Sequence, residues 1–192
     1  QAAAAVRTAI NIARIDTPSG SRYAAYFGDA AANVYAVDAS NGSVIWKTKV
    51  DNFPLARVTG SPVFYNGKLY VGVASGEEMG AVPTNYECCR FRGSLVAMDA
   101  VSGEMKWRTY TITEEAKPTK KNSSGTQMWG PSGAPIWTAP AMDPQKSVIY
   151  VTTGDNYSDP PTANSDAFLA IDRDTGKILW SRQMTANDAY TS

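Results

Sequence analysis

Short apolar segments and turn residues alternate along the chain in a pattern that repeats. Three copies share an alternating apolar segment that ends on Asp, a Gly four residues later and a Trp four residues after that: Asp38, Gly42 and Trp46; Asp99, Gly103 and Trp107; Asp172, Gly176 and Trp180. Alternation with a period of two is typical of strands, and Asp and Gly favour tight turns. Each copy therefore predicts a β-hairpin that ends on a large apolar anchor.

A second hairpin precedes each of the later two copies. Residues 62–65 and 68–73 flank Asn66-Gly67, which is a strong hairpin signal, and residues 140–142 and 148–151 flank Asp143-Pro144. Two hairpins make four strands, and four-stranded sheets arranged radially form the blades of a β-propeller. We therefore predict an all-β chain whose residues 1–192 form one domain of about three to four propeller blades.

The repeats are separated by more sequence than the ~40–45 residues of a compact blade. The surplus lies in residues 75–92 and 113–135. Long loops of a propeller gather on one face, and binding and catalytic residues concentrate in such loops. We expect the chemistry of this protein there.

Composition excludes several classes of function. The sequence contains no His, which rules out Ser-His-Asp hydrolysis, HExxH metalloprotease sites and mixed Cys/His zinc sites. Its 18 Lys and Arg balance its 18 Asp and Glu, so we expect no nucleic-acid partner. The one basic cluster, residues 117–121, is predicted to be a solvated loop. No apolar run is long enough to span a membrane, and residues 1–10 lack the pattern of a signal peptide.

The repeat Ala-x-Asp-x-x-x-Gly-x-x-x-Trp resembles the tryptophan-docking motif of quinoprotein alcohol dehydrogenases, eight-bladed propellers that hold pyrroloquinoline quinone (PQQ) and usually Ca²⁺. Residues 86–93, 127–133 and 154–160 are most similar to the polyvinyl-alcohol dehydrogenase-like branch. The resemblance implies a partial propeller and PQQ-dependent oxidation of an alcohol. Because open sheet edges invite pairing, we expect the remainder of the propeller or further copies of the chain to complete a ring.

The resemblance also implies roles for single residues. Ser75 and Gly76 match the pair that contacts the quinone carboxylates, and Thr59 matches a residue that bonds the quinone. Glu78 matches a Ca²⁺ ligand, which is apt because Ca²⁺ prefers oxygen donors. A shift of one residue would give that role to Glu77, and a solvated acidic turn is the structural alternative.

The resemblance points to three further positions. Trp137 matches a Trp whose indole lies flat beneath the quinone, or else is one more core Trp. Asp155 stands where the family usually has an Asn ligand for Ca²⁺, and the neighbouring Asn156 is the alternative equivalent. Arg92 matches an Arg that pairs with a cofactor oxygen, or else simply opens the next strand.

Cys88 and Cys89 are adjacent, and family members carry a disulfide between such a pair against the upper face of the cofactor. A disulfide persists only in an oxidising compartment, so the resemblance implies a periplasmic or secreted bacterial protein. Two free buried thiols are the alternative.

The family mechanism uses Ca²⁺ to polarise the quinone while an Asp takes the alcohol proton. The corresponding phrase here, residues 187–191, offers Asp188 as the catalytic base, but the family's final carboxylate position is Thr191. Either Asp188 serves, or the base lies elsewhere, or this variant does not oxidise alcohols. The implied partners are a small-molecule or polymeric alcohol and a periplasmic electron acceptor such as a cytochrome c.

Two other functions compete with the dehydrogenase. The first is a cofactor-free propeller that acts as a protein-binding scaffold, which would need neither Glu78, the Cys pair nor Trp137. The second is a carbohydrate-active propeller that uses paired carboxylates such as Asp155 and Asp159, for which the sequence offers no positive motif.

Overall fold

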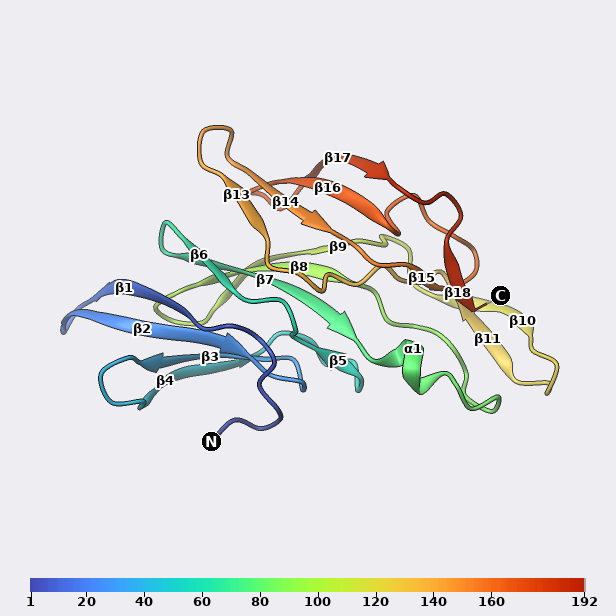
Figure 1. Ribbon diagram of the computed structural model, residues 1–192, viewed down its shortest axis with the longest axis horizontal. Helices are drawn as coiled ribbons and strands as arrows, with labels where there is room; N and C mark the ends of the chain where they lie inside the picture. The colour runs from blue at the N-terminus through green and yellow to red at the C-terminus, as the bar shows by residue number, and fades with distance from the viewer. Residues whose placement is uncertain (192) are drawn as a thin grey trace.

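The computed structural model describes residues 1–191, and three antiparallel sheets dominate it (Figure 1). The first blade contains β1 (Asn11–Thr17), β2 (Gly20–Gly28), β3 (Asn33–Asp38) and β4 (Val44–Lys49). The second blade contains β5 (Ala56–Arg57), β6 (Val63–Tyr65), β7 (Lys68–Ser75), β8 (Ser94–Asp99) and β9 (Met105–Tyr110), with β5 and β6 both paired to β7. The third blade contains β13 (Ala141–Asp143), β14 (Val148–Thr152), β16 (Ala167–Asp172) and β17 (Ile178–Gln183).

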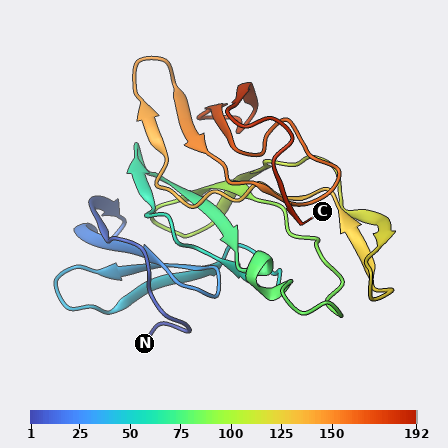
Figure 2. The same ribbon diagram turned by 45° about the vertical axis from the view of Figure 1, so that its right-hand side comes forward.

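The three blades follow one another in chain order from the blue to the red end of the ribbon, and the second lies between the other two (Figures 1 and 2). The predicted hairpins and the predicted all-β blades are confirmed. The turns also agree with the sequence, because Gly42, Gly103 and Gly176 all adopt a positive φ, which glycine tolerates without strain.

The insertions between strands carry the smaller elements. A hairpin joins β10 (Lys117–Lys121) to β11 (Gln127–Gly130), and a small sheet joins β12 (Ser132–Gly133), β15 (Asn156–Ser158) and β18 (Ala189–Thr191). A single helical turn, α1 (Glu77–Gly80), follows β7. The prediction of a loop at 117–121 was wrong, because pairing with β11 makes this segment a strand, although all five of its residues are exposed as expected. In the part of the chain that the structure describes, no helix is long and apolar enough to cross a membrane.

The second blade is buried on both faces, which explains why its central strands read as nearly continuous apolar runs. Leu69 and Val71 of β7 pack into the cluster shared with the first blade, whereas Tyr70 packs into the cluster shared with the third. Successive side chains of a strand point to opposite faces, so one strand supplies both interfaces. This packing fixes the end of β7 between the two neighbouring blades.

Candidate functional site

The end of β7 is one wall of the predicted site. Ser75 is buried, and its Oγ accepts a hydrogen bond of 2.8 Å from the backbone N–H of Glu77, which turns the chain into α1. A Cβ at Gly76 would overlap the guanidinium of Arg57, so the absence of a side chain there lets that cation lie against the strand end.

Arg57 is a residue that the sequence did not indicate. Its Nε is buried and has no hydrogen-bond partner among the described residues. It reaches the site because β5 pairs with β7 and sets Arg57 opposite Ala74. A buried donor without a partner costs free energy, so this guanidinium is suited to an anionic ligand at Ser75 and Gly76.

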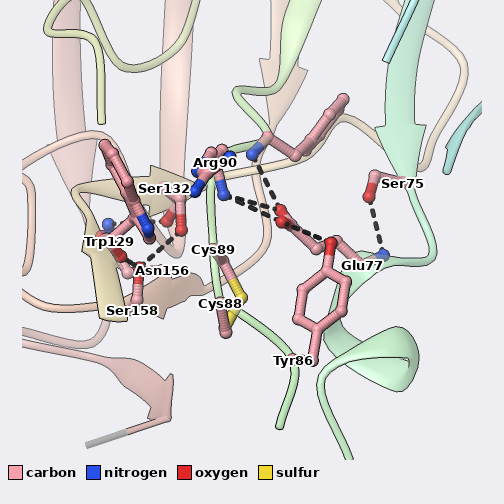
Figure 3. The surroundings of a disulfide bond; sticks show 11 residues. Ser75, Glu77, Tyr86, Cys88, Cys89, Arg90, Trp129, Ser132, Asn156 and Ser158 are labelled. Atoms are coloured by element: carbon pink, nitrogen blue, oxygen red, sulfur yellow. Dashed lines mark hydrogen bonds between the residues drawn. A yellow bond between two sulfur atoms is a disulfide. The ribbon is translucent and has the colours of Figure 1, made fainter. Parts of the chain in front are cut away.

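Glu77, the alternative to Glu78 in the sequence, has a structural role. Its side chain is 1% exposed, and its two oxygens accept hydrogen bonds from the Tyr86 hydroxyl (3.0 Å) and from the backbone N–H groups of Arg90 (2.9 Å) and Phe91 (2.8 Å) (Figure 3). Burial raises the pKa of Glu77, while the two backbone donors and the Tyr86 hydroxyl oppose that rise. The carboxylate therefore ties the strand end to the loop that carries the cysteines.

The Cys88–Cys89 disulfide is formed, and both residues are buried. The backbone holds the pair against β11, since Trp129 N–H donates to the Cys88 carbonyl (2.6 Å) and Cys89 N–H donates to the Trp129 carbonyl (3.1 Å). Figure 3 shows the disulfide between the hydrogen bonds of Glu77 on one side and those of Asn156 on the other. The structure therefore has the adjacent disulfide rather than two thiols.

Two carboxylates from separate segments, Glu78 and Asp188, repel a negative charge on Asp155. Burial, followed by repulsion from Glu78 and then Asp188, raises the pKa of Asp155 to about 6. Burial, with the negative charges of Glu78 and Asp155, likewise raises the pKa of Tyr157. Within residues 1–191, however, no three Cys, Asp or Glu side chains are gathered tightly enough to hold a metal by themselves.

Asn156 differs sharply from its neighbour Asp155. It is fully buried, its Nδ2 donates to the Ser132 carbonyl (3.1 Å), and its Oδ1 accepts hydrogen bonds from the backbone N–H (2.9 Å) and the hydroxyl (3.0 Å) of Thr162. Both lone pairs of the amide oxygen are engaged within the protein. Of the two candidate ligands, Asp155 is therefore the one with oxygen atoms to offer a cation.

Trp137 lies beside these carboxylates. A Cβ at Gly154 would be 2.7 Å from its indole Nε1, which places the ring against the residue that precedes Asp155. The Thr59 hydroxyl is 3.5 Å from the Trp137 carbonyl, so Thr59, which the sequence also suggested, lies next to Trp137. Because Trp137 is 37% exposed, it is not a buried core residue, and part of its ring remains available for stacking.

Arg92 points to a different part of the molecule. Its Nη1 donates to the Thr113 carbonyl (3.0 Å), its Nη2 pairs with Glu115 (3.5 Å), and its guanidinium lies 4.1 Å from the centre of the Tyr110 ring. The structure therefore places Ser75 and Gly76 at the end of β7, Thr59 and Trp137 beside the Gly154–Asp155 segment, and Asp188 beside Asn156, whereas it commits Arg92 to the segment after β9.

Comparisons with known proteins indicate the family of this chain. Residues 52–191 match the family described as glucose/ethanol/alcohol dehydrogenase, beta-propeller domain, and residues 5–87 match outer membrane protein assembly factor BamB. The chain is 42% identical over 189 residues to a polyvinylalcohol dehydrogenase of a Pseudomonas species, covering 98% of this chain and 30% of that protein. It is 44% identical over 186 residues to a polyvinylalcohol dehydrogenase of Sphingopyxis sp. strain 113P3, covering 97% of this chain and 28% of that protein.

The fold is also similar to a solved structure. Quinohemoprotein alcohol dehydrogenase ADHIIG of Pseudomonas putida HK5 superposes with a TM-score of 0.66 at 23% identity, covering 86% of this chain and 26% of that one. The likeness at this identity concerns the fold alone. The chain thus spans about 30% of the length of the relatives it matches.

Proposed function

Because the chain belongs to the PQQ family of glucose/ethanol/alcohol dehydrogenase beta-propeller domains, we propose that it supplies a cofactor-binding part of a PQQ-dependent alcohol dehydrogenase. Both polyvinylalcohol dehydrogenases are similar over nearly the whole chain, which supports an alcohol substrate, including a polymeric one. The bound quinone would supply the hydride acceptor for the oxidation. The protein supplies the placement and the charges around it.

The observation that carries the proposal is the set of carboxylates at Glu78, Asp155 and Asp188. Glu78 and Asp188 raise the cost of ionising Asp155, and a cation bound near them would lower that cost. A hard cation such as Ca²⁺ suits carboxylate oxygens and needs six to eight oxygen ligands. Glu78 and Asp155 are the ligands that this chain offers. Other oxygen atoms would have to supply the remaining ligands.

The other residues at the strand ends fit an anionic planar molecule. Ser75, Gly76 and the Arg57 guanidinium present polar and positively charged groups at one side, which is suited to the carboxylates of PQQ. Trp137 supplies an aromatic surface next to Asp155, and Thr59 adds a hydroxyl beside it. The buried disulfide belongs to the loop held at the strand end by Glu77, where it would cover the cofactor.

Asp188 is the residue that we assign to accept the alcohol proton. It lies immediately before β18, and its carbonyl accepts a hydrogen bond of 3.3 Å from the Asn156 backbone. This bond fixes the position of Asp188 next to the proposed cation ligand Asp155. An ionised carboxylate at this position could accept the proton of the alcohol.

The disulfide and the family support a setting for the reaction. We propose a periplasmic or secreted location, since adjacent cysteines stay oxidised there, and transfer of electrons to an acceptor such as a cytochrome c. The scaffold alternative has less support, because the match to the assembly factor ends at residue 87 and leaves out the disulfide, Trp137 and Asp155.

The test is reconstitution of the chain with PQQ and Ca²⁺, followed by the absorbance of the bound quinone after gel filtration and by dye reduction with primary, secondary and polymeric alcohols. We expect stoichiometric uptake, and weaker uptake by Trp137→Ala. Trp129→Ala is the matched control, because the Trp129 ring faces Arg90 and not the strand ends. A folded chain that takes up no quinone would contradict the proposal and favour the scaffold.

A further inference from the structure

Tyr157 connects parts of the candidate site that lie far apart in the sequence. It belongs to β15, two residues after Asp155, and its side chain is fully buried. Its hydroxyl donates to the Ser75 carbonyl at 3.4 Å, and its ring stacks on Phe91 with the centroids 6.1 Å apart. One side chain therefore joins the segment that carries Asp155 to the end of β7 and to the segment that follows the disulfide.

The backbone of Tyr157 is held between two strands. β15 pairs with β12 on one side and with β18, which begins directly after Asp188, on the other. The approach of β12 is close, because Gly133 adopts a φ of 102° and a Cβ there would be 2.4 Å from the Tyr157 nitrogen. A residue with a side chain would force the two strands apart at this point, so glycine permits the contact that fixes Tyr157.

The residues on either side of Tyr157 are also held by hydrogen bonds. The Asn156 amide donates to the Ser132 carbonyl at 3.1 Å. The Ser158 hydroxyl donates to the Trp129 carbonyl at 2.6 Å. Because both neighbours are buried and bonded in this way, the Tyr157 ring extends from a fixed base and its hydroxyl has a defined direction.

Tyr26 makes the same kind of contact away from the site. It is also fully buried, and its hydroxyl donates to the Ala100 carbonyl at 3.0 Å, which joins the first blade to the turn after β8. The bond from Tyr157 to Ser75 is longer, so we expect it to contribute less to stability. Hydrogen bonds at functional sites are often long before the ligand is bound.

The two ends of the Tyr157 contact belong to different ligands in the proposed function. Ser75 lies on the side suited to the carboxylates of PQQ, whereas Asp155 is a proposed ligand of the cation. A phenyl ring at position 157 would fill the same space in the core, but it could not donate to the Ser75 carbonyl. The hydroxyl, rather than the ring, is therefore the group that links the two sides.

We propose that Tyr157 is a positioning residue that couples the cation side of the site to the quinone side. The inference rests on the proposed function, because it concerns how that site is held together. The hydroxyl ties the end of β7 to the segment of Asp155, so a ligand that orders one side lowers the cost of ordering the other. Binding of Ca²⁺ and binding of PQQ therefore favour each other, and the effect is reciprocal.

Equilibrium dialysis of PQQ with and without Ca²⁺ tests this coupling in Tyr157→Phe, which keeps the ring and loses only the hydroxyl. We expect Ca²⁺ to tighten PQQ binding by less than about threefold in this variant, against at least about tenfold in the wild type. Tyr26→Phe is the matched control, since it also removes one buried hydroxyl from a backbone carbonyl, and it should keep the wild-type ratio. The urea midpoint should fall no further in Tyr157→Phe than in Tyr26→Phe, so that a loss of coupling is not a loss of stability.

Hydrogen exchange on the ligand-free chain is a second measurement, which needs no PQQ. The Gly76 N–H donates to the Leu55 carbonyl (2.9 Å), and the Asn156 N–H donates to the Asp188 carbonyl (3.3 Å), so these two amides report on the two sides of the site. We expect Tyr157→Phe to speed the exchange of both amides by at least about threefold and Tyr26→Phe to leave them unchanged.

The outcomes distinguish this inference from the proposed function. A wild-type ratio in Tyr157→Phe, or an equal loss of the ratio in Tyr26→Phe, would overturn the coupling while uptake of PQQ by the wild type still supports the function. Unchanged exchange of both amides in Tyr157→Phe would overturn it as well. A wild-type chain that binds no PQQ would instead contradict the proposed function, and the coupling with it.

Discussion

Two neighbouring carboxylates, Glu77 and Glu78, meet opposite environments. The Glu77 carboxylate has its hydrogen bonds satisfied, because a tyrosine hydroxyl and two backbone N–H groups donate to it, and the residue is 1% exposed. The Glu78 carboxylate instead repels the charge of Asp155 and thereby raises the pKa of Asp155. A buried charge whose hydrogen bonds are all satisfied stabilises a fold, whereas carboxylates that repel one another destabilise it. Proteins keep such destabilising groups mainly at functional sites. The difference indicates that Glu77 stabilises the fold, whereas Glu78 is available to bind a ligand.

We expect the largest loss of stability when the hydrogen bonds of Glu77 are removed. Glu77→Gln replaces an acceptor oxygen by an NH₂ group that faces backbone donors, so we expect a loss of about 2–4 kcal/mol in the free energy of unfolding. The matched Glu78→Gln should change it by less than about 0.5 kcal/mol. Urea unfolding of both variants without Ca²⁺ measures this. Equal losses would mean that the two acids do not differ in role.

The second prediction concerns the repulsion between Asp155 and its neighbouring carboxylates. Asp155→Asn removes the repelling charge and should stabilise the cation-free protein by on the order of 1 kcal/mol at pH 7, since Asp155 is only partly buried. The pKa of about 6 in the folded state lies above the ordinary value of 3.8, so the folded protein loses stability as pH rises through this window. The advantage of the Asn variant should therefore be absent near pH 4 and complete at pH 7.

Thermal unfolding from pH 4 to pH 8 checks the sign of this effect. Asp159→Asn is a suitable control, because Asp159 is paired with Lys120 away from the carboxylates. An advantage that grew toward low pH would show that Asp155 is stabilised by ionisation, contrary to this account.

A smaller effect distinguishes two arginines. Arg57→Gln should weaken PQQ binding by about tenfold, because it removes a guanidinium whose Nε has no partner in the described chain, whereas Arg92→Gln should leave binding unchanged. Fluorescence titration of both variants with PQQ measures the ratio. The reverse order would restore Arg92 to the role that the sequence suggested.

The sequence predicted what depends on local periodicity. The spacing of Asp38, Gly42 and Trp46 and its repeats were enough to predict the hairpins, because strand alternation and positive-φ turns are properties of short segments. The family resemblance, rather than this pattern, pointed to Ser75 at the end of β7 and to Asp155 between β14 and β15. Adjacent Cys88 and Cys89 likewise indicated the disulfide.

The sequence could not predict what depends on pairing across the chain. Arg57 reaches Gly76 only through the β5–β7 ladder, and the Asn156 amide is engaged by Thr162 and Ser132 from other segments. The basic segment 117–121 is a strand only because β11 returns beside it. Its lysines and proline indicated solvent exposure, which is correct, but not the partner strand.

The most direct test of the central claim is equilibrium dialysis of PQQ against the chain with and without Ca²⁺, for the wild type and the Glu78→Gln/Asp155→Asn double variant. The account predicts that Ca²⁺ tightens PQQ binding to the wild type by at least about tenfold and leaves the double variant unaffected, because its two ligands are gone. Equal tightening in both proteins would contradict the claim that these two carboxylates hold the cation.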